Sequence, residues 1–151
     1  MIVGDGPYRE TMERELSGTG AVFLGFRHGE ELSALYASSD LFVFPSVTDT
    51  LGHVVMESQA SGLPVLVSDV GASGELVSDA NGYLLPPGDA DALYEALLHF
   101  EGLPMEQRMR MGQEGARIAR ERFTWTAVGE RFLGLIRELH AQRAASGRLS
   151  A

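Results

Sequence analysis

The chain has 151 residues, of which 44% are hydrophobic and 22% charged, with no cysteine and a formal net charge of −9. This composition predicts one globular domain, and the lack of cysteine excludes a disulfide framework. The acidic balance argues against nucleic acid as a partner, because nucleic-acid binding needs a basic face. No apolar run approaches the roughly 20 residues of a membrane span, and we expect a cytoplasmic protein.

Strand and helix patterns alternate from the start of the chain. The predicted elements are the end of a strand at 1–3, a turn at Gly4-Asp5-Gly6-Pro7, a helix over 8–16, a strand over 21–26 and a helix over 30–38. Gly4, Gly6 and Arg9 occupy the positions of a dinucleotide-binding fingerprint, but arginine stands where the third glycine is needed. We reject that interpretation, because a partial match is weak evidence.

The stretch from Phe42 to Ser68 is the most informative part of the sequence. Residues 41–44 form a continuous apolar run, which predicts a strand buried on both faces. After the loop at 47–52, a helix is expected to begin at Gly52 or His53 and to end at Gly62, where glycine fits a left-handed cap. Pro64 blocks further helix and residues 65–67 begin the next strand, so the stretch predicts a strand–helix–strand unit of a parallel sheet.

The remaining elements are mainly helical. We predict a single helical turn near residue 75, a strand over 83–85, helices over 89–102 and 104–123, and a last helix capped by Thr124. The last helix has an apolar stripe of Val128, Phe132, Leu135, Ile136 and Leu139. The aromatic residues Phe123, Trp125 and Phe132 are expected to pack, and residues 146–151 to form a flexible tail.

Alternating strands and helices define an α/β fold class with a Rossmann-like parallel sheet flanked by helices. In such folds, ligands bind beyond the carboxyl ends of the strands. The segments predicted to share that edge are Gly4–Gly6, Gly25–His28, Ser46–Gly52 and Asp69–Gly74.

The start of the helix after Gly52 predicts an anion site. Unpaired amides and the helix dipole attract phosphate, and a glycine lets the ligand come close. Glu57 lies one turn after His53 on the same face and could accept hydrogen bonds from sugar hydroxyls, with Asp49 on the other side of the phosphate. The arrangement suits a nucleotide diphosphate that carries a sugar at each end.

These residues also carry a family resemblance. Asp49 and Glu57, with Gly52 between them and Ser61-Gly62-Leu63-Pro64-Val65 after, resemble the signature of retaining glycosyltransferases of family 4, which have the two-domain GT-B architecture. Four further segments look like family landmarks in the family's order: Gly4–Pro7, Phe23–Gly25, Pro45-Ser46 and Asn81–Asp89. The resemblance covers almost the whole chain.

The resemblance implies transfer of a sugar from a nucleotide-diphosphate sugar to an acceptor hydroxyl, with retention of configuration. Asp49 would contact the donor sugar and Glu57 the ribose, although the family more often has glutamate at the first position, one methylene longer. The donor-binding candidates are Gly4, Gly6, Arg27, Ser46, Thr50, Leu51, Gly52, His53, Val54 and Glu57. The resemblance implies no metal and no cofactor besides the donor substrate, and the four histidines are scattered rather than paired.

The resemblance also implies partners outside this chain. In the family, an amino-terminal domain supplies half the cleft, and a first strand–helix unit supplies an arginine and a lysine for the diphosphate. We therefore expect residues 1–145 to be one nucleotide-sugar-binding domain that lacks this unit, ends in a helix over 124–145 and is inactive alone. The acceptor would be a carbohydrate or lipid-linked group, with peripheral membrane association of the parent left open.

Simpler interpretations stand beside these. Asp49 could merely cap the helix, Glu57 could form a surface salt bridge, and His53 could contribute only its backbone amide. Residues 73–75 could extend the anion site or form a plain cap, and Arg27 and His28 could be without a ligand. For the whole chain, the alternatives are a non-catalytic nucleotide-sugar binding module or truncated remnant, and a nucleotide-sugar epimerase, which would convert the donor without an acceptor.

Overall fold

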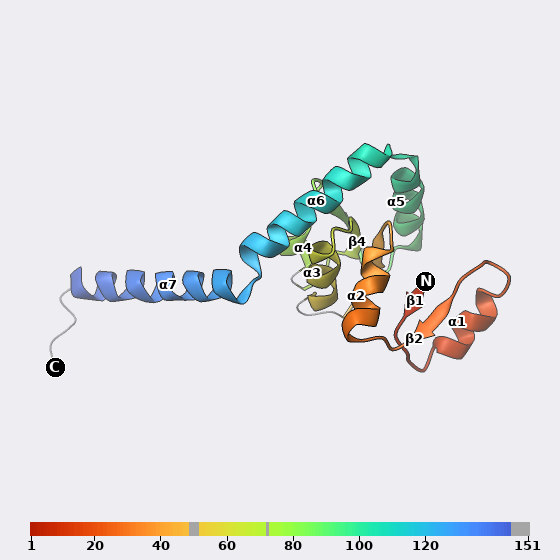
Figure 1. Ribbon diagram of the computed structural model, residues 1–151, viewed down its shortest axis with the longest axis horizontal. Coiled ribbons are helices and arrows are strands. Elements are labelled where there is room, and N and C mark those ends of the chain that lie inside the picture. Colours follow the sequence, from red (N-terminus) through yellow and green to blue (C-terminus); the bar gives the residue numbers. More distant parts are fainter. Residues whose placement is uncertain (49–51, 72, 146–151) are drawn as a thin grey trace. The chain divides into compact units, whose positions relative to one another are not determined.

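The computed structural model describes residues 1–48, 52–71 and 73–145, and the chain divides into two compact units, Met1–Ser38 and residues 39 onward. The first unit contains β1 (Ile2–Val3), α1 (Arg9–Glu15), β2 (Phe23–Gly25) and α2 (Gly29–Ala37) (Figure 1). Its two strands pair in parallel, with Ile2 beside Phe23 and Val3 beside Gly25. Each predicted element of this unit is confirmed to within two residues.

The second unit contains a parallel sheet and most of the helices. Its elements are β3 (Phe42–Phe44), α3 (His53–Ala60), β4 (Val65–Ser68), α4 (Ser73–Leu76), β5 (Gly82–Leu85), α5 (Ala90–Gly102), α6 (Met105–Arg122) and α7 (Trp125–Ala145). The strand order is β3-β4-β5, and both pairings are parallel. The predicted α/β class, with parallel sheets and flanking helices, is confirmed.

The core of this unit lies on both faces of β4, the central strand, whose four residues are all buried. Val65 and Val67 pack with Val55 of α3 and with Leu76 and Val77. The prediction that residues 41–44 are buried on both faces is wrong, because Val43 is 37% exposed and the other residues are only half-buried. Among the described strands, β3 pairs with β4 alone and is an edge strand of its sheet, so its apolar run is less covered than that of β4.

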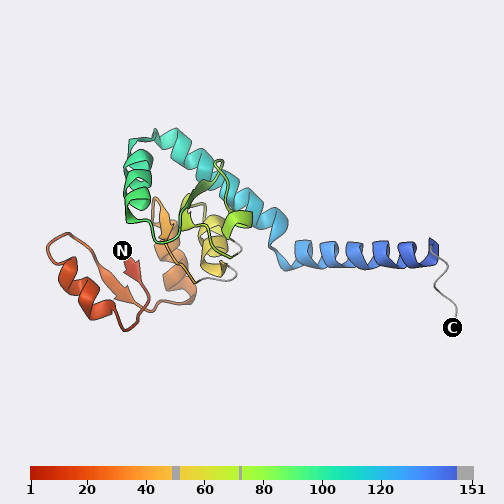
Figure 2. The same cartoon turned by 180° about the vertical axis from the view of Figure 1, so that it is seen from behind.

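Glycines let α6 and β5 approach their neighbours closely. A Cβ atom on Gly112 of α6 would lie 2.0 Å from the carbonyl oxygen of Gly62, just after α3, and one on Gly115 would lie 3.3 Å from Cγ of Gln59. A Cβ atom on Gly82 would lie 2.2 Å from the carbonyl oxygen of Val65. α6 therefore packs closely against α3 and the residue that follows it, and the two helices lie side by side in Figures 1 and 2.

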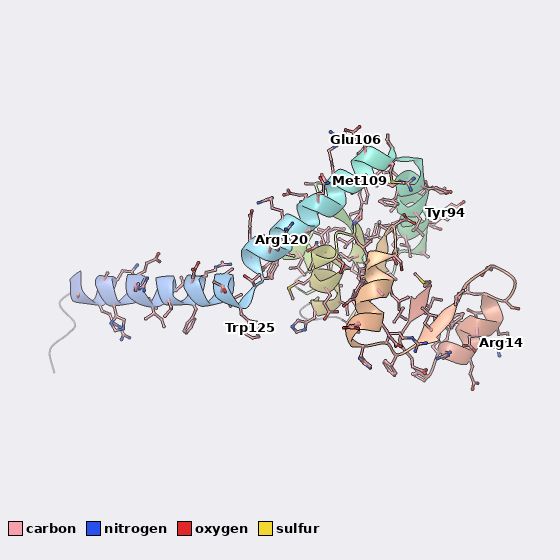
Figure 3. The ribbon with its side chains drawn as sticks, in the orientation of Figure 1. Arg14, Tyr94, Glu106, Met109, Arg120 and Trp125 are labelled. Carbon is pink, nitrogen blue, oxygen red and sulfur yellow. The ribbon has the colours of Figure 1, made fainter. Side chains whose placement is uncertain are left out.

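The last helix begins at a confirmed cap, since the amide of Ala127 donates to Oγ1 of Thr124 at 3.2 Å. Phe123 packs against the core as expected. The expectation that Trp125 and Phe132 also pack is wrong. Trp125, which Figure 3 labels, is 92% exposed, and Phe132 is 61% exposed. α7 is amphipathic, but each of its described side chains is at least partly exposed, so its apolar stripe lies open. Within the described ranges, no helix is both long and apolar enough to cross a bilayer.

Candidate functional site

The first turn of α3 contains backbone donors that have no acceptor in the described part of the chain. Gly52 is its N-cap in the left-handed conformation, with φ of 68° and ψ of 34°, and no side-chain cap is found among the described residues. The amides of Val55 and Met56 both donate to the carbonyl oxygen of Gly52 at 3.0 Å. The amides of His53 and Val54 find no acceptor within the described ranges, so they can donate to an anion that also benefits from the helix dipole.

Gly52 packs closely against Leu76. It is buried, and a Cβ atom on it would lie 2.8 Å from Cδ1 of Leu76. A positive φ disfavours any residue with a side chain, so this position combines a conformational and a steric need for glycine. The predicted helix start at Gly52 or His53 is confirmed, and so is the left-handed glycine at position 62, where φ is 84°.

Other predicted residues of this unit lie on either side of the turn. His53 and Glu57 are exposed one helical turn apart, and Val54 is half-buried. Ser46 is half-buried just beyond β3, and its Oγ accepts a hydrogen bond from the amide of Thr48 at 3.3 Å. The predicted residues Asp49, Thr50 and Leu51 lie outside the described residues.

The first unit carries a second group of predicted residues, at the carboxyl ends of β1 and β2. Gly4, with φ of 118°, donates its amide to the carbonyl oxygen of Gly25 at 2.8 Å, and the amide of Gly6 donates to Oδ1 of Asp5 at 2.8 Å. Arg27 donates from Nη1 to the carbonyl oxygen of Phe26 at 2.9 Å. Gly4 and Gly6 therefore lie in the turn after β1, and Arg27 lies after β2.

Arg9 closes the turn of the first unit. Its guanidinium lies 3.2 Å from Asp5 and 2.8 Å from Glu13. The hydrogen bond to Glu13 is the main cause that raises the pKa of Arg9 above its ordinary value. Asp5 and Glu13 thus neutralise the charge of Arg9, the residue that stands where the dinucleotide-binding fingerprint has its third glycine.

Sequence reasoning missed the buried support of the α3 turn. Gln59 and Asn81 are completely buried, and both donate side-chain amide hydrogens to the carbonyl oxygen of Leu76, at 2.9 and 3.0 Å. The signal was present: Gln59 lies four residues after Val55, on the face of α3 that packs against the core. Nothing in the sequence paired it with Leu76, 17 residues further on.

The described residues contain no group of three or more His, Asp or Glu side chains that could hold a metal ion. What they do contain is an α/β arrangement of parallel strands, with a glycine-capped helix N-terminus after one strand. This is the architecture of a nucleotide-binding α/β protein, and it matches glycosyltransferase structures of the GT-B class.

Comparison with known proteins identifies the family. The family described as "Glycosyl transferases group 1" matches residues 1–100, and the chain belongs to this family. It is 39% identical over 134 residues to the sulfoquinovosyl transferase SQD2 of Arabidopsis thaliana, covering 84% of this chain and 25% of that protein. It is 34% identical over 145 residues to a GDP-mannose-dependent alpha-mannosyltransferase of Mycobacterium tuberculosis, covering 95% of this chain and 36% of the relative.

A solved structure agrees with this assignment. Sucrose-phosphate synthase from Thermosynechococcus elongatus superposes with a TM-score of 0.78 at 28% identity, over 93% of this chain and 38% of that protein. The chain therefore spans between a quarter and two fifths of the length of these three relatives.

Proposed function

We propose that this chain is the donor-binding part of a glycosyltransferase that moves a sugar from a nucleotide-diphosphate sugar to an acceptor hydroxyl. The observation that carries the proposal is the family match over residues 1–100, a range that contains every predicted site residue. The name of one relative includes dependence on GDP-mannose, which supports a nucleotide sugar as donor. We assign the diphosphate to the amides of Gly52, His53 and Val54, the ribose to Glu57 and the donor sugar to Asp49.

The finer assignments belong to the same proposal. We place the chain in glycosyltransferase family 4, with retention of configuration and no metal ion, on the spacing of Asp49 and Glu57 around Gly52. In the same proposal, the other donor-binding residues are Gly4, Gly6 and Arg27 of the first unit and Ser46, Thr50 and Leu51 of the second. Because the chain spans only part of the length of these relatives, we assign the acceptor site to a separate amino-terminal domain of the parent protein. We place the parent protein in the cytoplasm, with peripheral membrane association as an open alternative.

A thermal melt with nucleotides tests the donor site. Scanning calorimetry is run on the chain alone and with excess UDP, GDP or ADP. Ligand at a hundred times its Kd should stabilise the fold by about 2.7 kcal/mol, which raises the Tm by roughly 5–10 °C. Glu57→Ala should abolish the shift, whereas Glu95→Ala, which removes an exposed carboxylate from α5, should retain it.

The outcome with each nucleotide decides between interpretations. A shift with one nucleotide that is lost in Glu57→Ala supports the donor site and identifies the base. A cooperative melt that no nucleotide shifts would refute donor binding by this chain and with it the binding-module alternative. Turnover of a sugar nucleotide to a second sugar nucleotide, without acceptor, would favour the epimerase.

A further inference from the structure

A buried side chain of α3 bonds to the end of α4. Gln59 is 0% exposed, and its Nε2 donates to the carbonyl oxygen of Leu76 at 2.9 Å. Leu76 is the last residue of α4 and its side chain is 4% exposed. Its Cδ1 lies 2.8 Å from the place where a Cβ atom on Gly52 would stand. Leu76 is thus attached to α3 twice, through its carbonyl group to Gln59 and through its side chain to the N-cap.

The bond from Gln59 is not needed to satisfy that carbonyl group. Nδ2 of Asn81 also donates to the carbonyl oxygen of Leu76, at 3.0 Å. On the other side of the amide, Oε1 of Gln59 is buried and has no hydrogen-bond partner among the described residues. A buried acceptor without a donor is unfavourable, and a methionine of similar length would avoid it.

We propose that Gln59 is a positioning residue for the donor site, acting through Leu76 on Gly52. By fixing Leu76, it holds the left-handed N-cap in place, and with it the direction in which the amides of His53 and Val54 point. This inference rests on the proposed function for its biological meaning. Its physical content is a coupling between a buried amide and the first turn of α3, which can be measured without any nucleotide.

Gln59→Met tests the coupling. The substitution keeps the length of the side chain and removes the donor, while Asn81 still satisfies the carbonyl group of Leu76. We expect hydrogen exchange, followed by mass spectrometry, to show protection of residues 53–56 and 73–78 reduced by roughly threefold to tenfold, the range that loss of one net hydrogen bond gives. Protection of α5 should not change. If the wild-type chain binds a nucleotide, its Kd should rise by a similar factor.

The matched control is Ser58→Ala. Ser58 is also 0% exposed on α3, but its hydroxyl donates only to the carbonyl oxygen of Val55, at 2.8 Å, within the same helix. This variant should leave the exchange of residues 73–78 and the Kd for nucleotide unchanged.

Gln59→Glu adds a rescue that a merely structural role would not show. Burial raises the pKa of the introduced carboxyl group. Below that pKa the neutral acid can donate to the carbonyl oxygen of Leu76, and above it the carboxylate cannot. Protection factors of residues 53–56 and 73–78 should therefore approach those of the wild type at pH 5 and fall at pH 8.

Two results would overturn the inference. One is unchanged protection of both segments in Gln59→Met. The other is an equal loss of protection in α5, which would make Gln59 a general stability residue. A wild-type chain that binds no nucleotide would refute the proposed donor site instead, and the exchange of residues 53–56 would still decide the coupling.

Discussion

Gly52 and Gly62 form a natural pair for testing the donor site, because both are left-handed glycines at the two ends of α3. Their φ angles are 68° and 84°. They differ in surroundings: a Cβ atom on Gly52 would lie 2.8 Å from Leu76, whereas one on Gly62 would meet nothing within 4 Å. They differ also in the proposed role, since only Gly52 lies at the anion-binding turn.

The structure gives the expected size of each effect. Replacing either glycine by alanine forces a left-handed alanine, which costs about 1–2 kcal/mol. Gly52→Ala adds the displacement of the buried Leu76 side chain, about 1 kcal/mol at the lower end for overpacking. We therefore expect the free energy of unfolding to fall by about 1–2 kcal/mol in Gly62→Ala and by about 2–3 kcal/mol in Gly52→Ala.

Urea unfolding measures the stability of both variants, and isothermal titration with the nucleotide that stabilises the wild type measures binding. Gly52→Ala should lose binding, because the added methyl group and the altered N-cap disturb the amides of His53 and Val54. Gly62→Ala should bind with the Kd of the wild type. Equal binding by both folded variants, whether retained or lost, would contradict the assignment of the diphosphate to the α3 turn.

Three further predictions concern stability, pH and surface. Gly112→Ala should lower the free energy of unfolding by about 1–3 kcal/mol, because its Cβ atom would lie 2.0 Å from a backbone oxygen. Gly115→Ala should change the free energy of unfolding by less than about 1 kcal/mol. Equal urea midpoints of the two variants would refute the close contact of α6 with α3. Burial, aided by the negative charge of Asp79, raises the pKa of Tyr83, so the native state disfavours the tyrosinate. The free energy of unfolding should therefore fall as pH rises above about 10. Tyr83→Phe should flatten that decline, and an unchanged pH profile of the melt would contradict the prediction. The open apolar stripe of α7 should bind the dye ANS, and Phe132→Asp with Leu135→Lys should reduce the fluorescence at unchanged helix content by circular dichroism; equal fluorescence would show that the stripe is covered in solution.

The alternation of elements could be predicted because local signals agreed with the tertiary structure. Gly62 and Pro64 mark the end of α3 in the sequence and in the structure, and Thr124 caps α7 as expected. What the sequence could not supply was the place of each strand in its sheet. The runs at β3 and β4 look alike, but one is an edge strand and the other is central, so only β4 is buried.

The residues of the α3 turn could be predicted from the sequence, whereas the buried residues that support the turn could not. Gly52, His53 and Glu57 follow one another on a single turn, so their arrangement follows from helix geometry. The support from Gln59, Leu76 and Asn81 depends on contacts between segments that are distant in sequence, and no local pattern encodes them. The same holds for Trp125, whose exposure depends on what covers α7 rather than on its own helix.

The hydrogen bonds of the buried Asn81 side chain affect how readily this residue can deamidate. Asn81-Gly82 is the kind of dipeptide that deamidates most readily, by attack of the glycine nitrogen on the asparagine amide. Here both ends of the Asn81 amide are hydrogen-bonded, and the nitrogen of Gly82 donates to the carbonyl oxygen of Ser78 at 3.0 Å. These hydrogen bonds must break before the ring can close, so we expect succinimide and isoaspartate at position 81 to form more slowly in the folded chain than in unfolded molecules. The isoaspartate content at position 81, measured by peptide mapping, should therefore rise with the time that a preparation has spent unfolded.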